Sequence, residues 1–467
     1  MRRRIPPLAA VLIAYVAVAL CYVFLTPLWQ APDEPAHYNY VRHLLTEARL
    51  PVLAEGDFPA QYLEELKASG FPPSAPIDGI RYESHQPPLY YLLAAPVLAA
   101  VVGDPAAVQV YALRLLSVLL GVAIVLLSYR LGRVIWPSEE GRPTVLAAVV
   151  AFIPMHTAVT AAISNDVLAE GLVIGAVVVA VRGALTPGPT PPPGGEGSKG
   201  THGQASTLPF RPVARGSSLP TGILLGLCLL TKTTAYIALP LVLLALLVAK
   251  FRLRLPSRDW FRQVLACLLT AAVLVLPWLA RNTLVYGASD PLGLARHDAI
   301  VVGQLRTSER LADVGLAAIL QEAVAMTFRS FWGVFGWMGV LMDERIYLAL
   351  ALVVGLSLAA LGHQAWGRAL RCRRGVAQDR RDAYLIAVLI LWGAVPGPLS
   401  LPGTACLGHW VASGSPLGQA AGASLRFDGA RPGSDLVRAR AGDGESSHCE
   451  HHASHRCRCG SARLVPA

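Results

Sequence analysis

The chain has 467 residues, of which 54% are hydrophobic and only 15% are charged. Much of the apolar content lies in blocks of the roughly 20 residues that cross a bilayer, whereas a soluble protein would alternate apolar and polar positions. The net charge of +10 does not indicate nucleic acid as a partner, because the arginines gather in short segments between the apolar blocks, as they do in cytoplasmic loops. The sequence therefore predicts an all-α polytopic membrane protein with about nine to eleven transmembrane helices.

The first apolar block, residues 5–26, follows a run of arginines and predicts a membrane helix with its N-terminus inside. A cleaved signal peptide is the alternative, but the block is long and lacks a clear small-residue cleavage site. The stretch PLWQAPDEPAHYNY follows and holds Asp33, Glu34 and His37. A helix that begins near Pro35 places Asp33 at its cap and His37 about one turn later. Carboxylates and an imidazole at a membrane surface can transfer protons, and the alternative is a helix cap with solvated charges.

Residues 27–86 form a predicted first extracytoplasmic loop, and loops of this length usually carry function. The loop ends in RYESHQPPLYYLL, which includes Arg81, His85 and Gln86. Residues 89–102 are apolar but short for a span. The positive-inside rule puts the arginine-rich segment 130–142 in the cytoplasm, so only one crossing fits before it. We therefore expect residues 89–102 to form a re-entrant or surface helix; if they cross instead, segment 130–142 faces out.

Further along the chain, residues 221–250 are too long for one span, and the polar sequence TKTT predicts a hairpin broken near Lys232. Residues 185–219 are rich in Pro, Gly, Ser and Thr and predict a disordered linker. Residues 281–322 are polar and expected outside the membrane, and the aromatic segment 328–338 is expected at its interface. Other apolar spans are predicted at residues 108–127, 144–163, 167–181, 346–361 and 384–401, with a further span ending at Pro277 and Trp278.

The chain departs from this pattern after residue 402, so residues 1–402 are predicted to form the membrane domain. Residues 403–467 lose the apolar runs and end in HCEHHASHRCRCG, whose Cys and His do not follow the spacing of structural zinc sites. We expect this tail to add no span and no metal site. It is either disordered or the product of a reading-frame shift.

Several motifs together resemble a known group. APDEPAH, HQPPLYYLL, RLLSVLLG, SNDVLAEG, LLTKTTAY, PWLARNTLVYG and FWGVFGWM follow one another in this order. Over residues 1–401 the chain resembles bacterial multi-pass membrane proteins related to glycosyltransferase family 39, in particular an uncharacterised family of predicted membrane proteins. This group belongs to the fold-C glycosyltransferases, which include the protein O-mannosyltransferases and the lipid A aminoarabinose transferase. The resemblance implies a fold-C helical bundle in the bacterial inner membrane.

The resemblance also implies a reaction. Such enzymes take a sugar from a polyprenyl-phosphate donor, and an acceptor in the cell envelope attacks the anomeric carbon outside the membrane with inversion. Membrane lipids are further partners, and nucleic acid is not. The resemblance fixes no cofactor besides the lipid-linked sugar donor, and a divalent metal ion is compatible with the group. Asp33, with Glu34 beside it, matches the catalytic acid of the first loop. Substrate-binding candidates are His37, Arg81, His85, Gln86, Asp166, Lys232 and Arg281, and Gln86 stands where relatives have Lys or His before the two prolines.

Each of these residues also has a plain structural interpretation. Asp166 could cap the helix that follows it, and Lys232 could extend its amine from a broken helix to the interface, although an intramembrane lysine by default suggests function. Arg281 could anchor the interface. For the whole protein, the alternatives are a lipid or solute transporter, since transporters place charges on broken helices, and a truncated, inactive transferase that lacks the C-terminal helices of the group.

Overall fold

The computed structural model describes residues 5–185, 215–302 and 307–373, and these are mostly helical. The α-helices are α1 (Pro7–Leu25), α2 (Glu34–Glu47), α3 (Ala60–Ser69), α4 (Leu89–Ala99), α5 (Ala106–Ile135), α6 (Gly141–Ala151), α7 (Pro154–Val159), α8 (Asn165–Leu185), α9 (Arg215–Leu229), α10 (Ala238–Arg252), α11 (Ser257–Tyr286), α12 (Leu294–Ile300), α13 (Thr307–Trp332) and α14 (Glu344–Arg373). Two short 3₁₀ helices, η1 (Tyr82–His85) and η2 (Thr233–Ile237), and an antiparallel hairpin of β1 (Val334–Phe335) and β2 (Val340–Leu341) complete the described elements.

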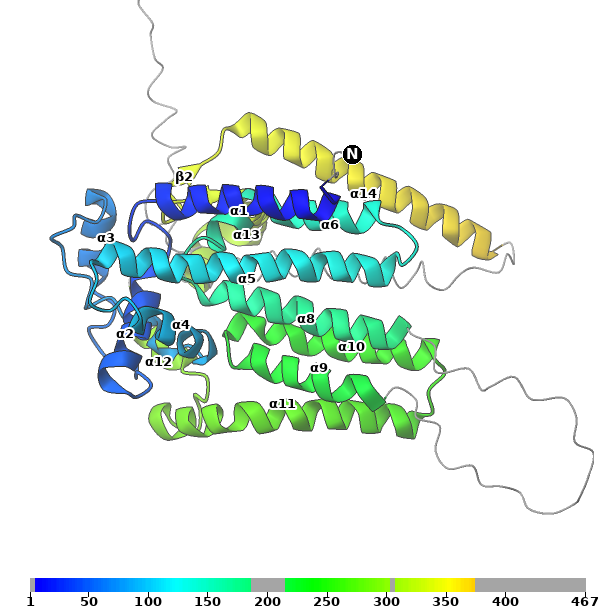
Figure 1. Cartoon of the computed structure of the whole chain (residues 1–467), viewed down its shortest axis with the longest axis horizontal. Coiled ribbons are helices and arrows are strands. Elements are labelled where there is room, and N and C mark those ends of the chain that lie inside the picture. Colours follow the sequence, from blue (N-terminus) through cyan, green and yellow to red (C-terminus); the bar gives the residue numbers. More distant parts are fainter. Residues whose placement is uncertain (1–4, 186–214, 303–306, 374–467) are drawn as a thin grey trace, which may run out of the picture. The chain divides into compact units, whose positions relative to one another are not determined.

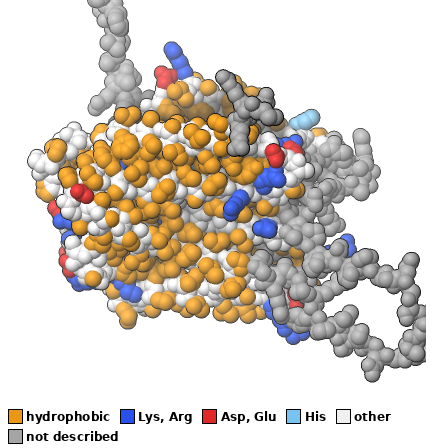
Figure 2. All heavy atoms as spheres, in the orientation of Figure 1, with side chains coloured by type: hydrophobic (Ala, Val, Ile, Leu, Met, Phe, Trp, Pro, Cys, Tyr) orange, Lys and Arg blue, Asp and Glu red, His pale blue; other side chains and the backbone are white. Residues whose placement is uncertain are grey.

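Five of the described helical segments are long and apolar enough to cross a membrane: Pro7–Leu25, Ala106–Ile135, Thr233–Phe251, Ser257–Tyr286 and Glu344–Gln364. Figure 2 shows hydrophobic side chains over the middle of one face and Lys, Arg, Asp and Glu near its two ends. This distribution suits a bilayer, whose apolar core is bounded by water on both sides. The chain is therefore an all-α membrane protein.

The centre of the bundle consists of long helices that lie side by side (Figure 1): α5 packs on α8, and α8 packs on α9 and α10. The contact between α9 and α11 is very close. A Cβ atom added to Gly222 would lie 2.6 Å from the carbonyl oxygen of Cys267, and one added to Gly226 would lie 2.8 Å from Leu274. Only glycine allows the two backbones this approach, which is how small residues promote helix packing in membranes.

The first loop folds into a layer of short helices at one end of the bundle. Helix α4 has 11 residues, which gives a length of about 16 Å, too short to cross a bilayer core. It packs on α2, where the rings of Tyr40 and Tyr91 stack with centroids 3.6 Å apart. The geometry fits the expected surface or re-entrant helix at residues 89–102.

Two of the predicted segments differ in the structure. The predicted span 144–163 is wrong, because α6 ends at Ala151 and α7 begins at Pro154. Pro154 lacks an N–H for a helical bond, and the preceding Ile153 is extended, as a residue before proline usually is. The predicted linker 185–219 is too long at its end, since α9 begins at Arg215.

Two further predictions concern where helices end. The break near Lys232 is present, because α9 ends at Leu229 and Lys232 itself has an extended backbone. The helix predicted to end at Pro277 and Trp278 continues to Tyr286 with Pro277 inside it. The predicted linker up to residue 214, the span 384–401 and the tail 403–467 lie outside the described residues.

Candidate functional site

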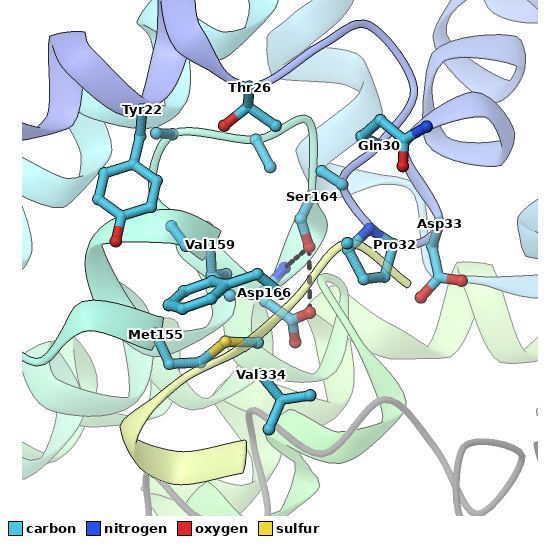
Figure 3. Close-up of a pocket in the computed structure, with 16 residues that line it drawn as sticks. Tyr22, Thr26, Gln30, Pro32, Asp33, Met155, Val159, Ser164, Asp166 and Val334 are labelled. Atoms are coloured by element: carbon cyan, nitrogen blue, oxygen red, sulfur yellow. Dashed lines mark hydrogen bonds between the residues drawn. The ribbon is translucent and has the colours of Figure 1, made fainter. Parts of the chain in front are cut away.

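A cavity of about 120 Å³ lies where the end of α1, the start of the first loop, α7 and the hairpin strand β1 meet. Its walls are mainly apolar and include Tyr22, Met155 and Val334. Its polar lining includes two carboxylates, because Asp33 and Asp166 both face this space (Figure 3). An apolar chamber with a few convergent polar groups is the usual form of a ligand site.

Asp33 directly precedes α2, with a left-handed backbone at φ 61°. Asp and Asn adopt this conformation more readily than other residues with a side chain. The Tyr82 hydroxyl donates to Asp33 Oδ1 at 2.6 Å. Burial raises the pKa of Asp33 above its ordinary value, while the Tyr82 hydrogen bond and the charge of Lys232 oppose that rise. A carboxylate with a raised pKa is a better proton acceptor than an ordinary one, as a general base requires.

Asp166 and Lys232 form an ion pair beside the cavity. Lys232 Nζ lies 2.7 Å from Asp166 Oδ1, and Ser164 Oγ donates to Asp166 Oδ2 at 3.0 Å. Both charged side chains are held by helix breaks: Asp166 at the start of α8, and Lys232 between α9 and η2. The amide of Leu89 donates to the carbonyl of Leu230 at 2.9 Å, which ties the break to the end of the first loop.

Glu83 was not predicted from the sequence, although it lies within the RYESHQPP motif. It is buried on η1, and its Oε2 atom has no hydrogen-bond partner among the described residues. Burial, followed by the charge of Asp33, raises the pKa of Glu83 to about 8. Lys232 and Asp166 act on it as well, so Glu83 belongs to the same group of charges as Asp33.

The imidazoles of His37 and His85 are buried close to this group. His37 Nδ1 lies 2.9 Å from the Tyr91 hydroxyl, and burial lowers the pKa of His37 well below its ordinary value. His85 Nδ1 lies 3.1 Å from the Tyr82 carbonyl, so this nitrogen carries the proton. Burial, followed by the neighbouring His297, lowers the pKa of His85 to about 3. Both imidazoles are therefore neutral near pH 7.

Gln86 and His85 share a contact that fixes the Gln86 amide. The ring nitrogen Nε2 of neutral His85 is an acceptor, and Gln86 Nε2 lies 3.4 Å from it. The Gln86 side chain also hydrogen-bonds the Glu83 carboxylate. Its Oε1 atom is buried without a partner among the described residues. Gln86 therefore holds neighbouring side chains of η1 in place.

The arginine candidates are directed to other partners. Arg81 pairs with Asp57 at 2.9 Å within the first loop. Arg281 donates to the carbonyls of Leu50 and Pro51 at 3.2 and 2.6 Å. Both side chains hold the first loop in place, and Arg281 does so from the end of α11. The structure thus brings together Asp33, Asp166, Lys232, His37, His85 and Gln86, and it engages Arg81 and Arg281 elsewhere.

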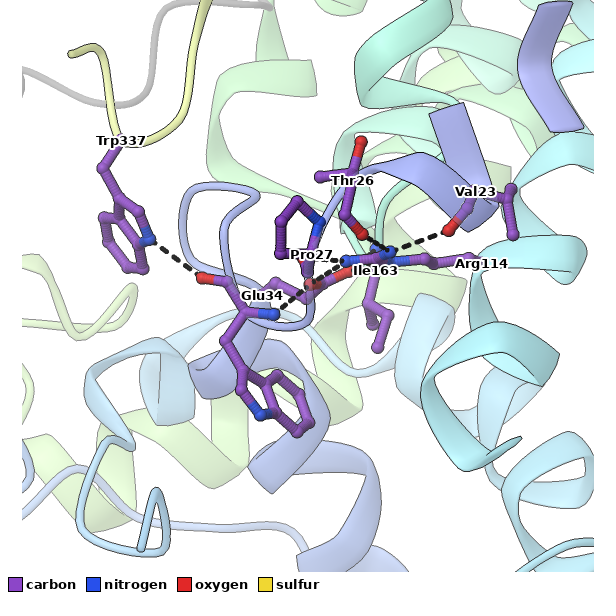
Figure 4. A network of polar contacts seen from close by, with 8 residues as sticks. Val23, Thr26, Pro27, Glu34, Arg114, Ile163 and Trp337 are labelled. Atoms are coloured by element: carbon purple, nitrogen blue, oxygen red, sulfur yellow. Dashed lines mark hydrogen bonds and ion pairs between the residues drawn. The ribbon is translucent and has the colours of Figure 1, made fainter. Parts of the chain in front are cut away.

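Glu34 differs sharply from Asp33, its neighbour in sequence. Its carboxylate is fully buried and receives two hydrogen bonds of 2.7 Å from Arg114, which is also fully buried (Figure 4). The backbone amides of Trp29 and Ile163 donate to the same carboxylate. Arg114 uses its remaining donors on the carbonyls of Val23, Thr26 and Pro27. This geometry does not fit the predicted catalytic role of Glu34, because its acceptor positions are occupied by structural partners.

The sequence analysis also missed Arg114, Tyr82 and a polar contact between His156 and Glu170. A signal for Arg114 was present, because a single arginine in an apolar helix requires a buried partner. Tyr82 gave no such signal, since its contact with Asp33 joins residues 49 positions apart. Among the described residues, no group of three or more His, Cys, Asp and Glu side chains is arranged to hold a metal ion.

Comparison with known proteins identifies no relative. No family model matches the chain, and neither a curated protein nor a solved structure matches it.

Proposed function

We propose that this protein is a multi-pass glycosyltransferase of the inner membrane. It moves a sugar from a polyprenyl-phosphate donor to an acceptor in the cell envelope, with inversion. The observation that carries the proposal is the cavity, whose apolar walls suit a lipid chain and whose polar lining is provided by Asp33, Asp166 and Ser164. The sequence resemblance to fold-C transferases supports the same reaction.

In the proposed step, Asp33 is the general base. It removes the proton from the acceptor hydroxyl while the acceptor oxygen forms a bond to the anomeric carbon. The bond between that carbon and the phosphate oxygen breaks, and its electron pair leaves on the lipid phosphate. The Tyr82 hydrogen bond to Oδ1 orients the carboxylate and leaves Oδ2 for the proton. Positioned acid–base groups of this kind typically contribute 10²–10⁴-fold to a rate.

The leaving phosphate needs positive charge. Lys232 is suited to this, because its charge acts on Asp33 while its amine lies 2.7 Å from Asp166. Asp166, which lines the cavity, anchors the lysine amine beside it. A preorganised cation at the developing anion stabilises the transition state.

Glu34 is given a structural role in this proposal. Together with Arg114 it joins the end of α1 to the start of α2, the junction where Asp33 lies. Arg81 and Arg281 shape the first loop around the site.

The direct test uses the full chain in lipid nanodiscs. It is supplied with radiolabelled polyprenyl-phosphate sugars, one sugar at a time, with membranes as the acceptor source. Asp33→Asn should lower transfer by about 10²–10⁴-fold, because the base is lost. The control is Asp78→Asn in the same loop, since Asp78 is exposed and pairs only with Arg42 at the surface. Equal transfer by wild type and Asp33→Asn would remove Asp33 from the mechanism.

The orientation is tested separately. Single cysteines are placed at the exposed positions Glu55 and Glu140, in a chain without other accessible thiols. An impermeant thiol reagent added outside should label position 55 and spare position 140, because the arginine distribution places residues 130–142 in the cytoplasm. Labelling of position 140 from outside would show that α4 is part of a crossing.

A transporter is the second candidate, and one observation favours it. His156 on α7 lies 3.1 Å from Glu170 on α8, and the ring of Tyr15, from the middle of α1, is 6.3 Å from the His156 ring. An ionisable pair beside the middle of a membrane helix is typical of proton pathways. Proton flux into liposomes, measured with a trapped pH dye, should be absent if the protein is a transferase. Flux that Glu170→Gln abolishes would favour the transporter.

A further inference from the structure

Two acids at the candidate site, Asp33 and Glu83, have unequal partners. The Tyr82 hydroxyl donates to Asp33 Oδ1 at 2.6 Å. Glu83 follows Tyr82 in the chain, yet its Oε2 atom is buried and has no hydrogen-bond partner among the described residues. Gln86 Oε1, three positions on, is also a buried acceptor without a donor in that part of the chain. The Gln86 side chain hydrogen-bonds the Glu83 carboxylate, but Glu83 Oε2 and Gln86 Oε1 remain without a donor in the described part of the chain.

The charges around the two acids do not allow both to ionise easily. Lys232 is already paired with Asp166 at 2.7 Å. His37 and His85 are neutral near pH 7, because burial holds the pKa of each below its ordinary value. His297, from α12, also faces this group, with its ring 4.6 Å from that of His85. Two carboxylates in one buried site raise each other's pKa, so one of them retains its proton.

Burial and hydrogen bonding decide which acid retains the proton. A donor to a carboxylate stabilises the ionised form, whereas a buried oxygen without a donor favours the neutral acid. Each acid has one donor, the Tyr82 hydroxyl for Asp33 and the Gln86 side chain for Glu83. Glu83 is the more buried of the two, and its Oε2 atom has no partner among the described residues. Burial, followed by the charge of Asp33, raises the pKa of Glu83 to about 8, which agrees with a proton on Glu83.

We propose that Glu83 carries the proton and Asp33 the negative charge of this two-acid site, and that the Tyr82 hydroxyl sets this order. Tyr82 and Glu83 are positioning residues that act through Asp33. The catalytic meaning of this order rests on the proposed function. In the transfer step Asp33 takes the acceptor proton and Glu83 keeps its own. Because Glu83 is neutral, the site carries one negative charge fewer when the phosphate anion leaves.

Infrared difference spectroscopy of the full chain in nanodiscs tests the order without any transfer assay. The carbonyl band of a protonated carboxylic acid should be present at pH 7 and disappear as the pH rises through about 8. Glu83→Gln should remove this band. Asp33→Asn should keep the band at low pH but make it disappear at a lower pH than in wild type, because the Asp33 charge no longer raises the pKa of Glu83. In Tyr82→Phe a second protonated acid should appear at pH 7, because Asp33 loses its donor. The matched controls are Tyr62→Phe, whose hydroxyl bonds Pro76 in the same loop, and Glu65→Gln at an exposed position.

A second arm measures the pH dependence of transfer. Wild-type activity should fall above about pH 8 as Glu83 ionises. Glu83→Gln should retain activity and lose this fall, since an amide resembles the neutral acid in shape and charge. Tyr82→Phe should move the acidic limb of the profile to higher pH.

The two arms separate the two hypotheses. The expected band without any transfer activity would support the proton order and reject the glycosyltransferase. A band at pH 7 that persists in Glu83→Gln and disappears in Asp33→Asn would overturn the order. Absence of any protonated-acid band in wild type at pH 7 would overturn it as well.

Discussion

Asp33 and Glu34 are adjacent in the chain and lie in opposite environments. Glu34 is completely buried, with Arg114 and backbone amides as its partners. Asp33 lines a cavity, and the Tyr82 hydroxyl donates to its Oδ1 atom. The difference shows how the same side-chain chemistry becomes structural or reactive. A carboxylate whose acceptor positions are all used is fixed, and one with a free oxygen beside a cavity can exchange a proton.

The comparison extends to the two buried cations. Arg114 is surrounded by carbonyls and Glu34, so it has no donor left for a ligand. Lys232 pairs with one acid, Asp166, and lies at an extended break between two helices. The planar fork of Arg suits a fixed network, while the single amine of Lys on a flexible stem suits a site that binds and releases an anion.

The largest expected effect on stability comes from breaking the buried ion pair of Glu34 and Arg114. Arg114→Met leaves Glu34 charged and unpaired in a fully buried position, which typically costs about 3–5 kcal/mol. We expect little folded protein by size-exclusion chromatography in detergent. The double variant Glu34→Met with Arg114→Met should be clearly more stable than Arg114→Met alone, because no isolated charge remains. Equal losses in the single and double variants would mean that the ion pair is not the source of the effect.

A smaller loss of stability is expected from breaking the ion pair of Lys232 and Asp166. The side chains of Lys232 and Asp166 are 10% and 23% exposed, so water compensates part of a lost partner. Lys232→Met should lower the free energy of unfolding by about 2 kcal/mol, and adding Asp166→Asn should recover part of it. Thermal unfolding followed by tryptophan fluorescence measures both. A loss as large as that of Arg114→Met would show that water does not compensate for the missing partner in the pair of Lys232 and Asp166.

The next effect depends on pH. The pKa of Glu83 is raised from 4.5 to about 8 in the fold, so the folded state holds a proton that the unfolded state releases. Its contribution to stability is complete below about pH 4.5 and is lost as the pH rises through about 8. Glu83→Gln should remove this decline in melting temperature, while the exposed control Glu65→Gln keeps it. A parallel decline in Glu83→Gln and wild type would assign it to another group.

The smallest expected effect on stability is that of Asp33→Asn. Asn tolerates the left-handed backbone at this position and can still accept from Tyr82. The free energy of unfolding should change by less than about 1 kcal/mol, even though transfer is lost. Denaturation monitored beside the transfer assay checks this. A large fall in stability would place Asp33 in the same structural class as Glu34 and weaken its assignment as the base.

Part of this site was predictable from the sequence, because the signals are local. The apolar blocks indicated a helical membrane protein, and the polar TKTT segment indicated the break at Lys232. The proline-rich stretch indicated a helix that starts after Asp33, but the Asp33 side chain makes no capping hydrogen bond. The break at Pro154, which the sequence analysis did not predict, is also marked by a local signal. There a proline within an apolar block should have outweighed the length of the block.

What the sequence by itself determined is therefore the class of the protein and the places where its helices begin and end, since hydrophobicity and backbone preference act over a few residues. Only the tertiary structure decided which charges meet. Tyr82 reaches Asp33 across 49 positions, and Arg114 reaches Glu34 across 80. Asp33 and Glu34 have nearly the same local sequence, so no local rule could separate them. Their roles follow from burial and from their partners: a distant helix places Arg114 against Glu34 and not against Asp33.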